Sequence, residues 1–287
     1  MLFRSGNAIW FNDAAEEIGV DVMRWMFIRQ NVEKNLLFGY HKADDVRKKL
    51  LTLWNSYSFF CTYAEVDGFD PNEGNLEDCE LTILDKWILS KLNVLIQDAE
   101  NHLEAYKHDK YLKVVDAFIE DLSNWYIRRN RRRFWKTEDD SDKHAAYHTL
   151  YEVLLTLTKL LAPGLPFVAE EMYQNLTTGR KNSLMSVHLC DFPKSDSNLI
   201  DEILMLEVNS IRKIVELGRF ARNKSYIKIR QPLRSLKFHT EDKNLIQFIK
   251  THSDVIMDEL NVKSIENVSD SATLISWKLK PNLPVLG

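Results

Sequence analysis

Five arginines occupy six consecutive positions near the middle of the chain, from residue 128 to residue 133. Trp125 and Tyr126 precede this cluster, and Trp135 follows it closely. The whole chain carries a formal net charge of −4. Like charges at neighbouring positions repel one another, so a cationic cluster in an acidic protein indicates that an anionic group meets it. Arginines beside aromatic rings suit nucleic acid, because guanidinium groups bind phosphates and flat groups stack on bases.

The residues before the cluster predict an amphipathic helix that leads directly into it. Apolar side chains recur at steps of three and four residues, at Val115, Phe118, Ile119, Leu122 and Tyr126. The same steps continue to Arg129 and Arg133. Burying an unpaired guanidinium costs on the order of several kcal/mol, so these two arginines must find partners or leave the core.

Two interpretations of the cluster remain open at this point. In the first, the arginines pair with carboxylates of the same chain and interact with the carbonyl end of their helix. In the second, the helix continues beyond the core and offers arginines and rings to nucleic acid.

Composition restricts the class of protein. A chain of 287 residues that is 45% hydrophobic can bury more than one core. Its three cysteines, Cys61, Cys79 and Cys190, lack the spacing of a zinc site or a disulfide framework, which favours a reducing compartment. The sequence has no apolar run of the ~20 residues that span a membrane, and no signal peptide. We therefore expect a soluble, cytoplasmic protein.

No catalytic signature is present in the sequence. The nine glycines form neither a phosphate-binding loop nor a dinucleotide-binding pattern, and no nucleophile elbow occurs. His144 and His148 are four residues apart, yet no glutamate follows His144, and the pattern favours surface or interface histidines over a metal site. We predict neither catalytic residues nor a metal site.

Periodicity predicts a mainly α protein, in which an antiparallel helical bundle is followed by a small α+β domain. Asp21 is expected to cap an early helix, and residues 186–189, 227–230, 236–238 and 275–279 read as short strands. We expect connector helices over 1–41, the bundle over 42–193, and the α+β domain over 194–287.

The stretch from Leu122 to Trp135 resembles the anticodon-binding domain of the isoleucyl-tRNA synthetases, which are class I aminoacyl-tRNA synthetases. Related valyl enzymes share its Trp-Tyr-Ile start but typically lack the arginine-rich continuation. Further stretches of the chain are similar to the same family and extend the resemblance over nearly all of it: residues 161–176, 186–193, 227–233 and 258–263.

The resemblance implies a C-terminal fragment of the enzyme. Residues 5–7 and 19–25 resemble the segment after the family's Lys-Met-Ser-Lys-Ser loop, but Met1 to Ser5 contain no lysine. The catalytic and editing domains would lie upstream, together with the binding of ATP and Mg²⁺. The implied partners are isoleucine tRNA and the upstream catalytic domain of the same polypeptide. We expect this chain to be inactive in aminoacylation on its own.

Eight residues form the predicted tRNA-binding surface: Trp125, Tyr126, Arg128, Arg129, Arg131, Arg132, Arg133 and Trp135. For Tyr126 and Arg129, a role in fixing the helix within the bundle is the alternative. Lys224, Lys228 and Arg230 form a second basic group, which we interpret as the solvated face of a small sheet. The alternative function is a non-enzymatic helical scaffold that binds an acidic protein partner through the arginine cluster.

Overall fold

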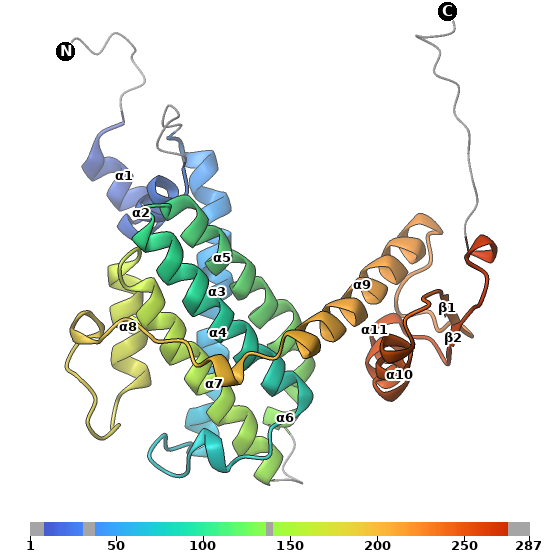
Figure 1. Ribbon diagram of the computed structural model, residues 1–287. Coiled ribbons are helices and arrows are strands. Elements are labelled where there is room, and N and C mark those ends of the chain that lie inside the picture. The colour runs from blue at the N-terminus through green and yellow to red at the C-terminus, as the bar shows by residue number, and fades with distance from the viewer. Residues whose placement is uncertain (1–8, 31–37, 136–139, 275–287) are drawn as a thin grey trace, which may run out of the picture. The chain divides into compact units, whose positions relative to one another are not determined.

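The computed structural model describes residues 9–30, 38–135 and 140–274. The chain divides into two compact units, a first unit from Met1 to Asp201 and a second unit from Glu202 to Gly287. Figure 1 labels the helices and strands of both. Within the described residues, no helix is long and apolar enough to cross a membrane.

The first unit is built from helices, which confirms the prediction of a mainly α fold. They are α1 (Phe11–Ile18), α2 (Val20–Ile28), α3 (Tyr40–Asp67), α4 (Ile83–Glu104), α5 (His108–Asp121), α6 (Arg128–Trp135), α7 (Asp140–Leu161) and α8 (Pro166–Leu176). A π-helical turn, η2 (Leu122–Ile127), joins α5 to α6, and a 3-10 turn, η1 (Leu76–Asp78), precedes α4.

The core of the first unit lies between the long helices α3, α4, α5 and α7, which lie side by side in Figure 1. Large apolar side chains fill it, including Leu53, Trp87, Leu112 and Leu154. Each side chain of this kind stabilises the fold by roughly 1.5–3 kcal/mol when fully buried.

Asp21 does not cap its own helix, as the sequence led us to expect, because Gly19 holds that position. Its buried carboxylate instead accepts a hydrogen bond at 2.7 Å from the backbone N–H of Val168 in the first turn of α8. Burial raises the pKa of Asp21, and the hydrogen bond from Val168 opposes that shift. Arg24 also donates to the carbonyl of Gly164 at 2.9 Å. These contacts attach α2 to the start of α8, so α2 packs as part of the first unit.

The connection between the two units is fastened to α4. The backbone N–H of Asp196 donates to Asn93 Oδ1 at 2.8 Å, and that of Asp201 donates to Ser90 Oγ at 2.8 Å. The first unit therefore extends to Asp201, whereas we placed the end of the bundle at residue 193.

Residues 186–189 form a 3-10 turn (Val187–Leu189) instead of the predicted strand. The hydroxyl of Ser186 accepts a hydrogen bond from the N–H of His188, and Glu170 Oε2 accepts one from the N–H of Val187. These side chains take up backbone donors that a strand partner would otherwise satisfy.

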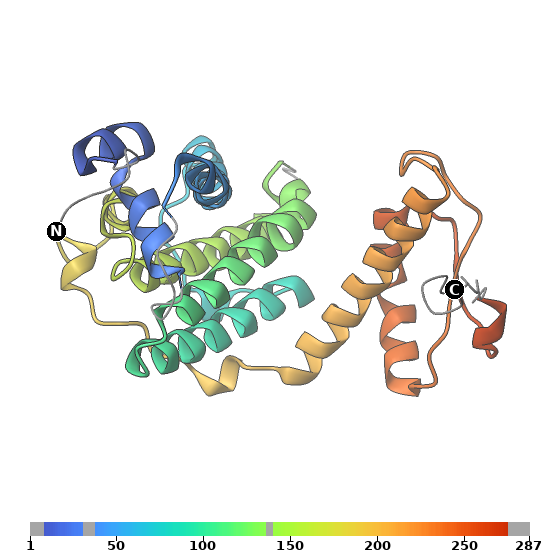
Figure 2. The ribbon, with the colours of Figure 1, turned by 90° about the horizontal axis from the view of Figure 1, so that it is seen from above.

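The second unit is a small α+β fold, as predicted. It contains α9 (Glu202–Lys224), β1 (Leu236–Phe238), α10 (Lys243–Thr251), α11 (Ser253–Leu260) and β2 (Ile265–Asn267). β1 and β2 pair in parallel with Leu236 opposite Ile265, and α10 and α11 pack along α9 (Figure 2). Residues 227–230 form a loop that ends in a turn instead of the predicted strand, while the strand predicted at 275–279 lies outside the described residues.

Close packing of α9 on α11 depends on Gly218. A Cβ atom at this position would lie 2.4 Å from Leu260 Cδ1 and 2.9 Å from its Cδ2. Leu260 is itself buried, so it cannot swing away into solvent.

We therefore expect Gly218→Ala to lower the free energy of unfolding of the second unit by about 1–3 kcal/mol, despite the better helix propensity of alanine. Urea denaturation followed by circular dichroism measures the change. In the double variant Gly218→Ala/Leu260→Ala the cost should be less than the sum of the two single costs, and strict additivity would contradict the overlap.

Candidate nucleic-acid interface

The arginine-bearing segment is anchored by one buried carboxylate, that of Asp85 in the first turn of α4. Asp85 forms a capping box with Thr82: its own N–H donates to Thr82 Oγ1, and its Oδ2 accepts the backbone N–H of Thr82 at 2.9 Å. The hydroxyl of Thr82 also donates to Oδ2, at 2.7 Å. The positive end of the α4 dipole favours a negative charge at this position.

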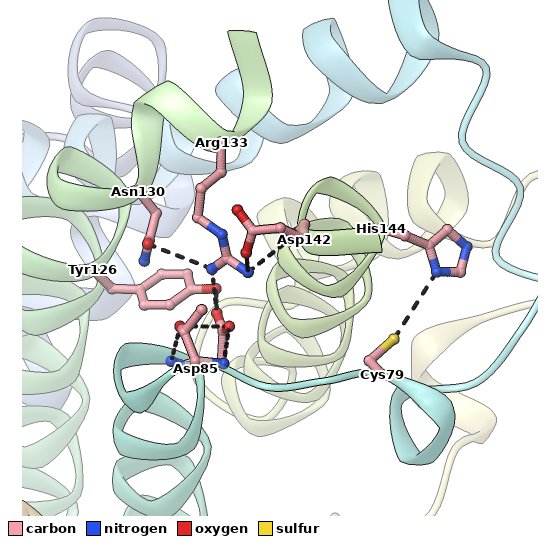
Figure 3. A network of polar contacts seen from close by, with 8 residues as sticks. Cys79, Asp85, Tyr126, Asn130, Arg133, Asp142 and His144 are labelled. Atoms are coloured by element: carbon pink, nitrogen blue, oxygen red, sulfur yellow. Dashed lines mark hydrogen bonds and ion pairs between the residues drawn. The ribbon is translucent and has the colours of Figure 1, made fainter. Parts of the chain in front are cut away.

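The other carboxylate oxygen of Asp85 receives two groups from the arginine-bearing segment (Figure 3). The hydroxyl of Tyr126 donates to Oδ1 at 2.6 Å, and Nη1 of Arg133 donates to it at 2.8 Å. Nη2 of Arg133 forms a second ion pair with Asp142 Oδ1 at 2.7 Å and donates to the Asp142 carbonyl at 3.0 Å. One guanidinium thus joins the first turns of α4 and α7.

Burial and the charge of Asp85 both shift the pKa values of Tyr126 and Arg133. Burial raises the pKa of Tyr126 well above its usual value, and the neighbouring charge of Asp85 raises it further. Burial alone would lower the pKa of Arg133, but the hydrogen bond and charge of Asp85 raise it above its usual value. Tyr126 therefore stays neutral and Arg133 stays charged.

The π-helical turn changes which residues of α6 face inward. The apolar stripe that precedes it predicts Arg129 and Arg133 at the centre of the inner face. A π turn contains one residue more than an α turn, and Asn130 and Phe134 are the residues that lie buried there. The shift moves Arg133 to the edge of the core, where its side chain remains 11% exposed and reaches Asp85.

The opposite side of α6 carries the side chains that reach solvent. They are Arg128, Arg131, Arg132 and Trp135, at the spacing i, i+3, i+4 and i+7 that places residues on one helical face. We call these four residues the outer face of α6. The Nε of Arg128 donates to the carbonyl of Asn124 at 2.8 Å, so this side chain lies against the preceding turn of its own helix.

Two aromatic residues of α3 extend the outer face. The Arg131 guanidinium lies 5.8 Å from the ring centre of Phe59, and the Trp135 ring lies 6.4 Å from that of Tyr63. Phe59 and Tyr63 themselves are in ring contact at 4.8 Å. Sequence reasoning missed both residues, although their position away from the buried stripe of α3 was a usable signal.

The prediction that all eight residues form a surface is wrong for three of them. Tyr126 is fully buried, Trp125 is 6% exposed, and Arg133 is held in ion pairs. Arg129 is half-buried and has interactions of its own within the protein. The first interpretation, pairing within the chain, therefore holds for Arg133, while Arg128, Arg131 and Arg132 are exposed and their contact with nucleic acid stays a prediction.

His144 and His148 are not both surface residues. Their Nε2 atoms lie 3.2 Å apart, and His148 is buried against Phe69, where burial lowers its pKa. Cys79 Sγ lies 3.9 Å from the other ring nitrogen of His144. Within the described part of the chain, no three histidine, cysteine or acidic side chains come together as metal ligands would.

The neighbouring arginines Arg132 and Arg133 should differ sharply in their effect on stability. Arg133→Met leaves the Asp85 charge buried without its cation, so we expect a loss of about 3–5 kcal/mol in the free energy of unfolding. Arg132→Met should change it by less than about 0.5 kcal/mol. Tryptophan fluorescence in urea reports on the first unit, since six of the seven tryptophans precede residue 202. Equal effects of the two substitutions would contradict the assigned roles.

Tyr126 should also make stability depend on pH in the alkaline range. In the unfolded chain a tyrosine loses its proton near pH ~10, whereas the folded protein holds that of Tyr126 to higher pH. The unfolded state then binds fewer protons, so stability falls as pH rises above ~10. Tyr126→Phe should flatten this decline between pH 9 and 11, whereas the substitution Tyr106→Phe at an exposed residue should not. Identical slopes for the wild type and Tyr126→Phe would refute the effect.

Comparison with known proteins assigns the chain to a family. Residues 85–237 match the family model described as the anticodon-binding domain of tRNA ligase. Isoleucine–tRNA ligases of Clostridium tetani and Clostridium novyi are 42% and 44% identical to the chain, each over 98% of it. That of Thermus thermophilus is 40% identical over 98% of the chain. In each case the match covers 27% of the relative, so the chain spans about a quarter of the length of these proteins.

The fold also occurs in a solved structure. The agnB2 LeuRS of Agrobacterium radiobacter K84, crystallised in a ternary complex with tRNA and LeuAMS, superposes with a TM-score of 0.51. The superposition covers 68% of this chain and 22% of that one, at 16% sequence identity. The resemblance that residues 122–135 suggested is confirmed, and the chain belongs to the anticodon-binding domain family of tRNA ligases.

Proposed function

We propose that this chain is the tRNA-binding portion of an isoleucine–tRNA ligase, and that the outer face of α6 contacts the anticodon arm of isoleucine tRNA. The family match and the names of the relatives support the proposal. The observation that carries it is the outer face itself, an exposed row of three arginines and a tryptophan on a helix whose opposite side is fixed in the core.

The chemistry of the outer face suits an RNA loop. Bases in a loop can leave the stack and lie against aromatic rings, while cationic groups bind the adjacent phosphates. Trp135 is 55% exposed, and Tyr63 and Phe59 continue its aromatic surface toward Arg131. Arg132 has no carboxylate partner among the described residues, so its charge is available to an anion.

Ligase chemistry belongs, in this proposal, to parts of the polypeptide outside this chain. Activation of an amino acid needs ATP and Mg²⁺, but the sequence contains no glycine-rich phosphate loop. The role proposed for this chain is to hold the tRNA while another domain carries out the reaction, in the cytoplasm where tRNA is charged.

The double variant Arg131→Ala/Arg132→Ala tests the proposal. Each phosphate contact contributes ~0.7–0.9 to the slope of log affinity against log salt concentration, so we expect the slope to decrease by about 1.4–1.8. Fluorescence anisotropy with labelled isoleucine tRNA at several salt concentrations measures it.

The control removes two exposed cations from the first two turns of α5, in Lys110→Ala/Lys113→Ala, and should leave the slope unchanged. An unchanged slope in the arginine variant would remove these residues from the site. Equal binding of isoleucine tRNA and a scrambled RNA of the same length would instead favour a scaffold for acidic partners.

A further inference from the structure

The end of α9 and the loop after it form a second region of concentrated positive charge, in the second unit. No aspartate or glutamate occurs between Glu216 and Glu241, although acidic residues outnumber lysines and arginines by 42 to 38 in the whole chain. The same stretch contains exposed cations that have no carboxylate partner within the described residues. These are Lys224, Lys228, Arg230 and Arg234.

Several other cations of the second unit have acidic partners or neighbours. Lys213 pairs with Glu216 at 3.0 Å, and Arg219 pairs with Glu259. Lys237 lies opposite Glu266 in the parallel strand pair. Lys243, Lys250 and Lys263 also form no ion pair among the described residues, but each lies within four positions of an aspartate or glutamate. Residues 224–234, which we call the α9 loop, contain four unpaired cations and no acidic residue.

The α9 loop is held in a fixed conformation by Arg222. This side chain is 5% exposed and donates to four backbone carbonyls: those of Lys228, Gln231, Leu260 and Asn261, at 3.1, 2.9, 2.7 and 3.1 Å. Asn261 adds a hydrogen bond from Nδ2 to the carbonyl of Ile229 at 3.1 Å. The carbonyls of the loop thus turn inward, and its cationic side chains turn to solvent.

Arg222 also adds charge to this region. Its partners are neutral carbonyls, and no carboxylate within the described residues compensates it. A guanidinium keeps its proton at any physiological pH. The interior of the loop therefore reinforces the positive potential at its surface.

Tyr226 occupies a backbone position that does not suit it. α9 ends in a Schellman motif, in which the N–H of Ile227 donates to the carbonyl of Arg222 at 2.9 Å and that of Tyr226 donates to the carbonyl of Asn223 at 3.1 Å. The left-handed residue of this motif is usually glycine, whereas here it is Tyr226, with φ of 56°. Its side chain is 95% exposed, so the ring adds no packing that would offset the strain.

A rigid loop that carries unpaired cations and one projecting ring fits RNA. Cations bind phosphates of the backbone, and an exposed ring stacks on an unpaired base. An acidic peptide would satisfy the cations but would leave the tyrosine without a flat partner. We propose that the α9 loop is a second RNA-binding surface, in which Lys228 and Arg230 contact phosphates and Tyr226 stacks on a base. This proposal uses none of the outer face of α6 and rests on the proposed function only in taking tRNA as the RNA.

The first experiment measures charge contacts with the full chain. In Lys228→Ala/Arg230→Ala the salt slope for labelled isoleucine tRNA should fall by about 1.4–1.8. The matched control, Lys243→Ala/Lys250→Ala, removes two exposed cations from α10 and should leave the slope unchanged. A slope unchanged in the loop variant, or lowered equally in both, would overturn the proposal.

The second experiment separates a binding role of Tyr226 from a structural one. Tyr226→Gly relieves the left-handed strain, so the melting temperature of the second unit should stay the same or rise. The same variant should lose at least about fivefold in tRNA affinity if the ring stacks, and Tyr226→Phe should retain the affinity. Unchanged affinity of Tyr226→Gly would overturn the stacking role.

Comparing tRNA binding by the loop variant and by the α6 variant shows which of the two proposed surfaces is wrong. If Lys228→Ala/Arg230→Ala weakens tRNA binding and Arg131→Ala/Arg132→Ala does not, the RNA-binding role of the α9 loop is supported and that of α6 is overturned. The reverse result overturns the α9 loop alone. If neither variant weakens binding, both are overturned. Equal displacement of the tRNA by polyglutamate and by unlabelled RNA, at equal charge, would also overturn the assignment to RNA.

Discussion

The carboxylate of Asp85 determines which way the arginine-bearing helix faces. A carboxylate removed from solvent needs several hydrogen-bond donors, and Asp85 obtains them from Thr82, Tyr126 and Arg133. Two of these donors come from the segment that ends in α6. Because successive residues of a helix are about 100° apart, holding Arg133 against Asp85 leaves the outer face of α6 exposed to solvent.

Arginine serves two distinct purposes in this chain. Arg133 and Arg222 are internal connectors: the first joins the starts of α4 and α7, and the second joins a loop to the end of α11. A planar group with five donors can satisfy several acceptors in fixed directions, which a lysine cannot do. Arg131 and Arg132 of α6 and Arg230 and Arg234 of the α9 loop are exposed and form no ion pair with the described residues.

A net charge of −4 is compatible with binding to RNA because the charges are unevenly distributed. At physiological salt, charges separated by more than about 8 Å are largely screened from one another. The outer face of α6 and the α9 loop are each local concentrations of cations. Each also carries exposed aromatic surface, Trp135 in one and Tyr226 in the other. The outer face of α6 and the α9 loop therefore each combine local positive charge with an exposed ring, although the protein as a whole is acidic.

The sequence by itself determined the helical class, most of the helices, the small α+β fold and the family. Apolar residues at three- and four-residue steps specify a buried helical face wherever it packs, and the stretch from Leu122 to Trp135 is distinctive enough to indicate the family. The sequence could not predict the structural settings of Asp21 and Tyr226. Asp21 contacts Val168, which is distant in the sequence, and Tyr226 has a left-handed backbone angle. Neither feature leaves a local pattern in the sequence.

Only the tertiary structure decided which arginines are internal. The sequence gives no sign of the one-residue shift at the π turn, which moves Asn130 and Phe134 to the centre of the inner face. Nor does it show that Asp85, nearly fifty positions before Arg133, supplies the buried counter-charge. The site also includes Phe59 and Tyr63 of α3, because rings distant in the sequence meet α6 only when the bundle closes. Local periodicity records which face of a helix is apolar, whereas partners in a buried ion pair are chosen by packing between helices.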